Sequence, residues 1–115
     1  MQTTVSLEVA KLVDALGVKG NTEKWLQVHY PSTRTKLVLR PYVGLNDDDY
    51  NFYRAYSFSE ILDILPQIGE KLGWRVAGVG NRSEWQTQAH FLLDLYLTGG
   101  MEAVNEELKT LLANK

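Results

Sequence analysis

The residues with the clearest metal-binding composition are His90 and Asp94, which lie four positions apart. On a helix this spacing places both on one face, together with Gln86. Imidazole nitrogen and carboxylate oxygen are both zinc ligands, but no third ligand is identifiable, and the only other histidine, His29, lies in a distant segment. An ion pair on a helix surface explains the spacing better, so the sequence predicts no metal site.

The segment Gly78–Ser83 reads Gly-Val-Gly-Asn-Arg-Ser and lies between a predicted strand and a predicted helix. In dinucleotide-binding proteins such a turn presents backbone N–H groups and a helix N-terminus to a pyrophosphate. Here serine stands where the third glycine or alanine belongs, and no strand with an acidic residue follows. A turn that leads into a capped helix explains the segment, and we expect no cofactor.

The acidic run Asn46–Asp49 has carboxylate oxygens of the kind that calcium prefers. An EF-hand loop needs glycine at its sixth position and an acid at its twelfth. The twelfth position counted from Asp47 is Phe58. The run therefore predicts a solvated turn.

Nucleophilic catalysis has no recognisable machinery in this sequence. There is no cysteine, and we find no glycine-flanked nucleophilic serine, paired-carboxylate motif or phosphate-binding loop. The sequence therefore predicts no catalytic residue and a protein that is not an enzyme. An enzyme that acts on a small molecule through carboxylates, tyrosines and arginines remains a third alternative.

One predicted hairpin carries the strongest candidate for a binding surface. Lys24–Tyr30 and Thr35–Val43 alternate as strands, with a Tyr-Pro-Ser-Thr turn between them. If the leucines and Val28 of the hairpin face inward, the opposite face carries six aromatic, basic and polar side chains: Trp25, Gln27, His29, Lys36, Arg40 and Tyr42.

Three interpretations of this face are open. A helix could cover it, in which case Trp25 belongs to the core. An exposed face with Trp, Tyr and Arg has the composition of a protein–protein interface. Aromatic side chains interleaved with bases also stack nucleobases and neutralise phosphates, so single-stranded nucleic acid is the alternative ligand. Protein binding is the primary prediction because the chain has a net charge of −2.

The hairpin is positioned by helices whose ends are marked in the sequence. Ser57 and Glu60 form a capping box before a helix predicted to run from about Phe58 to Leu72, with a kink or a break at Pro66. Another helix, of about three turns, is expected between Ser6 as its N-cap and Gly17 as its C-terminal stop, because apolar residues between 5 and 16 repeat at helical spacing. Further strands are expected at 51–55 and 74–79, and further helices after the capping box Ser83–Gln86 and from residue 101 onward, beyond Gly99-Gly100.

These elements follow one another in the order α-β-β-(β)-α-β-α-α. The fold class is therefore α+β, with a small antiparallel sheet of three to four strands packed against about four helices. A length of 115 residues corresponds to one domain, 1–115. The helix after Ser83 is apolar nearly all round because of Phe91, Leu95 and Leu97, which predicts burial on more than one side or a partner, including a homodimer through the C-terminal helices.

Composition and charge place the chain among ordinary globular proteins. The absence of cysteine fits a reducing compartment, and neither a signal peptide nor a membrane span is recognised, so we expect a cytoplasmic protein. The first 45 residues contain six basic and three acidic residues, whereas the remainder contains six basic and eleven acidic residues. This asymmetry indicates a basic side that includes the hairpin.

Two stretches resemble small uncharacterised proteins of phages, prophages and conjugative elements of gut bacteria. The segment 5–13 is similar to their V-S-x-E-[IV]-A-K-L-[LV] opening, and 55–62 (Ala-Tyr-Ser-Phe-Ser-Glu-Ile-Leu) is similar to a second stretch of these proteins. Leu65-Pro66 and the tail after Gly99 depart from the pattern. The resemblance implies a non-catalytic accessory protein of a mobile element and assigns no functional residue.

Overall fold

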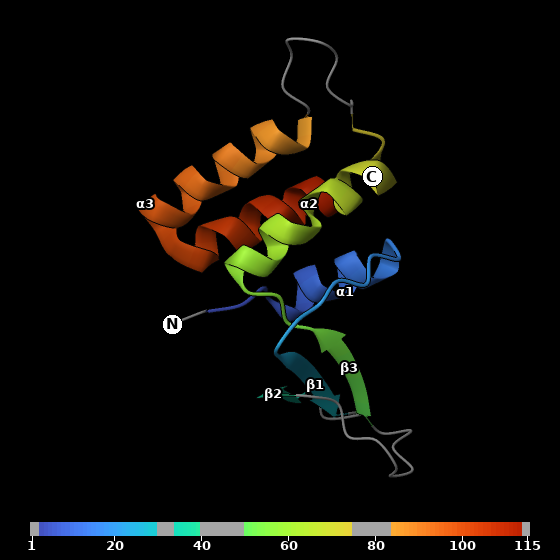
Figure 1. Cartoon of the computed structure of the whole chain (residues 1–115). Helices are drawn as coiled ribbons and strands as arrows, with labels where there is room; N and C mark the ends of the chain where they lie inside the picture. The colour runs from blue at the N-terminus through green and yellow to red at the C-terminus, as the bar shows by residue number, and fades with distance from the viewer. Residues whose placement is uncertain (1–2, 30–33, 40–49, 75–83, 114–115) are drawn as a thin grey trace.

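The computed structural model describes residues 3–29, 34–39, 50–74 and 84–113. In chain order these form α1 (Leu7–Ala15), β1 (Trp25–His29), β2 (Arg34–Val38), β3 (Tyr50–Arg54), α2 (Phe58–Leu72) and α3 (Glu84–Ala113). Figure 1 shows the helices packed together, with the sheet at one end of the helical layer. The predicted α+β class is confirmed.

Helix α1 begins and ends where its capping residues predict. The Ser6 hydroxyl accepts a hydrogen bond from the Val9 N–H at 3.3 Å, and Gly17 follows the last turn with φ of 84°. Val9 and Val13 are buried on its inner face. Local hydrogen bonding and apolar spacing therefore both determine this helix.

Helix α2 begins with the predicted capping box. The Ser57 side chain accepts from the Glu60 N–H, and the Glu60 carboxylate accepts from the Ser57 N–H at 2.8 Å. The helix continues through Pro66 to the left-handed Gly73, so of the two predicted alternatives, a kink or a break, the break is wrong. Buried apolar side chains on both sides of the proline, Ile61, Ile64, Leu65 and Ile68, offset the lost hydrogen bond.

Helix α3 consists of two arms joined at Gly100, whose φ of 70° and ψ of −165° are not helical. Figure 1 shows the second arm folding back alongside the first. This break confirms the predicted separation at Gly99-Gly100 into two C-terminal helices. The second arm buries its apolar side through Met101, Val104, Leu108 and Leu112.

The three described strands form one antiparallel sheet with the order β2-β1-β3. The hairpin of β1 and β2 and the third strand were predicted, and the structure confirms them. Of the predicted strand 74–79, only Trp74 lies among the described residues, and it is not in a strand. The predicted turn 30–33, the acidic run 46–49 and the glycine-containing segment 78–83 lie outside the described residues.

The core lies between the helices and the adjacent edge of the sheet. Tyr56, Ile61, Leu65 and Leu92 are among its largest fully buried side chains, and Leu26 and Tyr53 from the sheet pack against it. Within the described ranges, no helix is both long enough and apolar enough to cross a membrane.

Candidate binding face of the sheet

The pairing of the three strands places Trp25 and its cross-strand neighbours on one face of the sheet. Trp25 pairs with Val38 of β2 and Arg54 of β3, and Gln27 pairs with Lys36 and Phe52. Because paired residues project from the same face of an antiparallel sheet, these side chains form one surface. This surface is called the Trp25 face, and its described members are Trp25, Gln27, Lys36, Val38, Phe52 and Arg54.

Three of the six residues predicted for this surface are therefore shown to share it: Trp25, Gln27 and Lys36. The backbone of His29 pairs with Arg34 and Tyr50, in phase with Trp25 and Gln27. Arg40 and Tyr42 lie outside the described residues.

The members of the Trp25 face differ in accessibility. Lys36 is exposed, and Trp25, Val38, Phe52 and Arg54 are partly buried. Gln27, on the central strand, is only 9% exposed. A ligand would therefore contact Lys36 and the rims of the aromatic rings, while Gln27 mainly supports the surface.

Arg54 was not predicted, and it contacts Trp25 directly. Its guanidinium carbon lies 4.7 Å from the centre of a Trp25 ring, and its Nε donates to the Gly20 carbonyl at 3.0 Å. A cation over an indole ring is attracted by the negative face of the ring. The two contacts hold Arg54 against Trp25 and link the sheet to the loop before β1. Arg54 is a neighbour of Trp25 because β3 pairs with β1, and this pairing is not evident from the sequence.

The helices cover only part of the opposite face of the sheet. Leu26 packs against the core, and Val28 is buried, as predicted. Leu37 pairs with Leu26 and shares its face, but the assumption that Leu37 and Leu39 are covered is wrong, because these side chains are 41% and 76% exposed. Helix α1 packs against β3, whereas β2 is the far strand of the sheet, so the helical layer does not reach these leucines.

A network of hydrogen bonds centred on Glu60 lies where the sheet meets α2. Glu60 Oε1 accepts from the Ser57 N–H, and Oε2 accepts from the Glu23 N–H at 3.0 Å. The Thr22 hydroxyl lies 3.0 Å from Oε1. Burial acts to raise the pKa of Glu60, but these hydrogen bonds outweigh it and hold the pKa below its ordinary value.

This carboxylate borders an open cavity of about 300 Å³, which is also lined by Glu23, Lys24 and Ser59. Because Glu60 already accepts from several donors of its own chain, its chemical role is to fix the loop before β1 onto the start of α2. The geometry assigns it a positioning role.

The His90–Asp94 pair lies on the first arm of α3, where both side chains are exposed. Among the described residues, no group of three or more potential metal ligands comes together.

Comparison of the chain with protein-family models, with curated proteins and with solved structures gave no significant match.

Proposed function

We propose that this chain is a non-catalytic accessory protein of a phage or another mobile element, and that it binds a partner protein through the Trp25 face. The observation that carries the proposal is the position of Trp25. It is partly exposed on a sheet face, is held by Arg54, and has the exposed Lys36 on the neighbouring strand. Trp and Arg supply much of the binding energy at protein interfaces.

The charge of the strands supports a partner with acidic groups. The three strands contain two arginines and one lysine and no acidic residue. A partner that presents carboxylates to this face gains attraction and faces little competing negative charge from the sheet itself.

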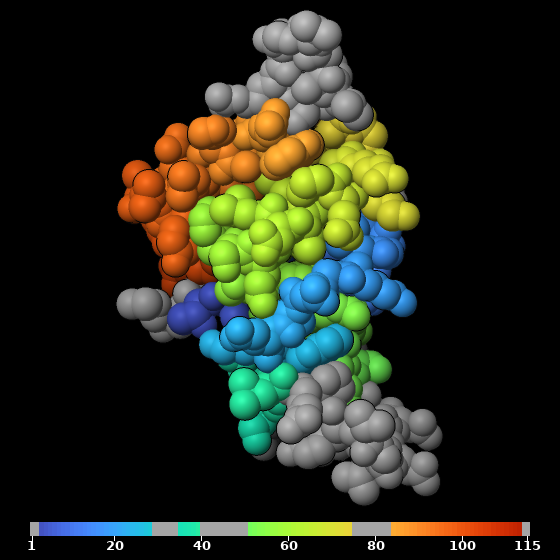
Figure 2. All heavy atoms as spheres, in the orientation of Figure 1, coloured from blue at the N-terminus to red at the C-terminus, as the bar shows by residue number. Residues whose placement is uncertain are grey.

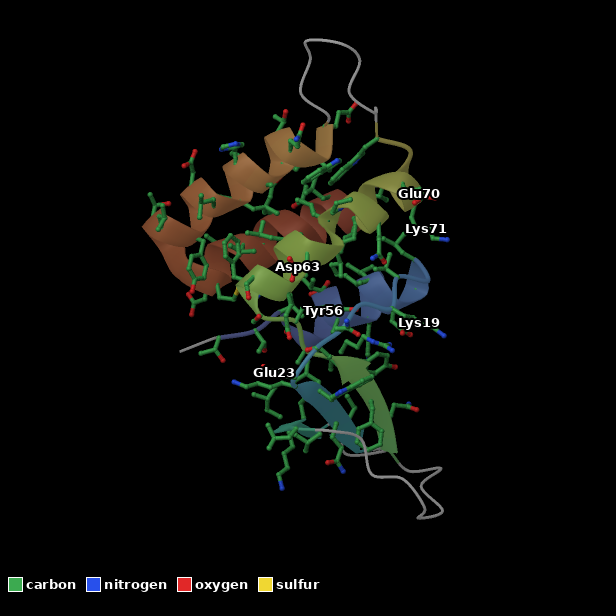
Figure 3. All side chains as sticks on the ribbon, in the orientation of Figure 1. Lys19, Glu23, Tyr56, Asp63, Glu70 and Lys71 are labelled. Atoms are coloured by element: carbon green, nitrogen blue, oxygen red, sulfur yellow. The ribbon has the colours of Figure 1, made fainter. Side chains whose placement is uncertain are left out.

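A photoreactive amino acid at a single position provides a direct test. We expect the probe at Lys36 to form a covalent adduct with the same partner in repeated incubations with host lysate. The matched control carries the probe at Lys71, an exposed lysine in the last turn of α2, well away from the sheet (Figure 3). Adducts that are identical at both positions, or absent at position 36, would overturn the proposal.

A charge reversal then tests the chemistry of the contact. Lys36→Glu should reduce capture of the same partner about tenfold, because it opposes carboxylates on the partner, whereas Lys71→Glu should leave capture unchanged. Both side chains are exposed, so neither change is expected to alter the fold. Equal capture by both variants would contradict a role for the Trp25 face.

Single-stranded nucleic acid is the second candidate ligand of this face. Trp25 and Phe52 lie on it together with Lys36 and Arg54, which are the residue types that stack on bases and contact phosphates. One consideration counts against it: a guanidinium already occupies one side of the Trp25 ring. Protein binding requires no vacant ring face.

Fluorescence anisotropy with a labelled oligonucleotide separates the two candidates. Nucleic-acid binding predicts an affinity that falls steeply with salt and that is reduced by Lys36→Glu and Trp25→Ala. No change in anisotropy at low salt would exclude this alternative.

We also propose that the chain associates with itself through its C-terminal helices. The first arm of α3 leaves four large apolar side chains accessible, Phe91, Leu93, Tyr96 and Leu97. Exposed apolar side chains gathered on one helix are typical of interaction surfaces. Sedimentation equilibrium over a wide concentration range tests this point, and a strict monomer throughout would refute it.

A further inference from the structure

Among the described residues, the outer edge of β2 has no partner strand. In the order β2-β1-β3 the central strand is β1, and β2 pairs only with β1 in the part of the chain that the structure describes. Figure 2 shows residues 34–39, in teal, at the margin of the molecule. Every second residue of an edge strand directs its backbone N–H and C=O away from the sheet, where an extended segment of another protein can pair with them.

The other outer strand, β3, has a helix packed against it. Helix α1 contacts β3, and the chain passes directly from Arg54 into Ala55 and Tyr56, which are buried. Strand β2 lies on the far side of the sheet, and its residues 35–37 are exposed. The edge that a second chain reaches without displacing a helix is therefore β2.

The two faces of β2 present different chemistry at this edge. Lys36 is exposed on the Trp25 face. Leu37 lies on the opposite face beside Leu26 and is 41% exposed, and Leu39, which follows the strand, is 76% exposed. None of the three strands contains an acidic residue. A strand added to β2 would therefore meet a cation on one face and apolar surface on the other.

The charge of Lys36 also indicates which kind of strand fits this edge. When two β2 strands pair antiparallel so that all five residues overlap, the two Lys36 residues stand directly opposite each other. Like charges in this position destabilise a strand pair, whereas a carboxylate opposite Lys36 is attracted. Edge lysines are a common device against self-pairing. The edge thus disfavours a second copy and favours an acidic strand.

We propose that β2 accepts an extended segment of the partner protein as an additional strand, in which carboxylate side chains alternate with apolar ones. This inference rests on the proposed partner binding by the Trp25 face and specifies the form of the bound segment. The carboxylates lie beside Lys36 because every second residue of a strand shares one face. The apolar side chains extend the surface of Leu26 and Leu37 beyond the helical layer.

Fluorescence anisotropy with two labelled peptides tests this chemistry. The probe is a short peptide in which glutamate alternates with valine, and the matched control has the same composition with the glutamates and valines in separate blocks. Only the alternating peptide places all its carboxylates on one face of a strand, so we expect it to bind about tenfold more tightly. Equal affinities for the two peptides, or no binding of either, would overturn the inference.

A pair of variants links the peptide to this edge. Lys36→Glu should weaken binding of the alternating peptide about tenfold, because it places like charges opposite each other. Lys71→Glu makes the same change at an exposed lysine of α2 and should leave the affinity unchanged. Equal effects of the two changes would show that the peptide binds elsewhere and refute the proposal.

Amide hydrogen exchange distinguishes strand addition from a contact through side chains alone. The alternating peptide should slow exchange of those β2 amides that point to the outer edge and leave the amides of β3 unchanged. Unchanged exchange in β2 with the peptide bound would refute strand addition, as would protection of β3 instead. Protection of β2 that rises with protein concentration in the absence of peptide would identify a second copy as the occupant and overturn the proposal.

Failure of this inference is distinguishable from failure of the proposed function. A partner that forms adducts with the photoreactive probe at Lys36, in a protein whose β2 amides gain no protection from the peptide, would leave partner binding intact and refute strand addition. Absence of adducts at position 36, with protection of β2 by the peptide, would support the edge as a site for acidic strands and refute partner binding in the lysate.

Discussion

The N–H of Gly20, in the loop that precedes β1, donates a hydrogen bond to the Tyr56 hydroxyl at 3.0 Å. Tyr56 is 1% exposed and lies where the sheet passes into α2 (Figure 3). A side chain at Gly20 would overlap Ile64 of α2, so only glycine allows this approach. The Gly20 carbonyl also accepts from Arg54. The backbone N–H and carbonyl of Gly20 thus attach the loop before β1 to Tyr56 and to Arg54 of the Trp25 face.

Tyr56→Phe should lower the free energy of unfolding by about 1–3 kcal/mol, because it leaves the Gly20 N–H without this acceptor while preserving the ring. Urea denaturation measures the change. Tyr96→Phe, at an exposed tyrosine, is the control and should stay within about 0.5 kcal/mol of the wild type. Equal stabilities of wild type and Tyr56→Phe would show that the hydrogen bond contributes nothing.

Glu60→Gln should cost about 1 kcal/mol near neutral pH, because the amide nitrogen cannot accept one of the hydrogen bonds that the carboxylate accepts. The pKa of Glu60 is lowered in the folded state, so its ionised form stabilises the fold fully above the ordinary value of 4.5. This stabilisation is lost as the pH falls through the folded-state pKa.

The difference in stability between wild type and Glu60→Gln should therefore shrink on acidification below pH 4.5, as followed by urea denaturation at a series of pH values. Glu70→Gln, on the exposed side of α2, is the matched control for the loss of one negative charge. A difference that grows as the pH falls would show that the ionised form of Glu60 does not stabilise the fold.

Gly100→Ala should destabilise the fold by about 1–3 kcal/mol, because φ of 70° with ψ of −165° is a region that only glycine adopts readily. The reversal of α3 at this residue brings the second arm back to the core. Thermal unfolding compares the variant with Glu102→Ala, an exposed position at the start of the second arm. An unchanged midpoint for Gly100→Ala would mean that the reversal does not depend on glycine.

Asn105→Ala should also cost about 1–3 kcal/mol. Asn105 Oδ1 accepts from the Ser6 N–H at 2.9 Å, and Nδ2 donates to the Thr4 carbonyl at 3.3 Å, which ties the segment before α1 to the second arm of α3. Amide hydrogen exchange of residues 4–6 should accelerate in the variant. Asn21→Ala, in an exposed loop, is the control, and equal exchange in both variants would contradict this role.

The positions of helix ends could be predicted because they depend on neighbours within a few residues. Ser57 and Glu60 are three positions apart, and their hydrogen bonds form as soon as one turn of helix exists. Gly73 and Gly100 stop their helices because glycine adopts positive φ without steric cost. Pro66 does not end the helix, because the packing of the whole helix outweighs one missing hydrogen bond.

The sequence by itself determined the helices, the hairpin and the alternation that places Trp25, Gln27 and Lys36 on one face, because these follow from local spacing. Only the tertiary structure decided that β1 is the central strand, that Arg54 lies against Trp25, and that Leu37 and Leu39 stay exposed. These relationships depend on which strands pair and how far the helical layer extends. Contacts between residues distant in the chain set both, and no short pattern encodes them.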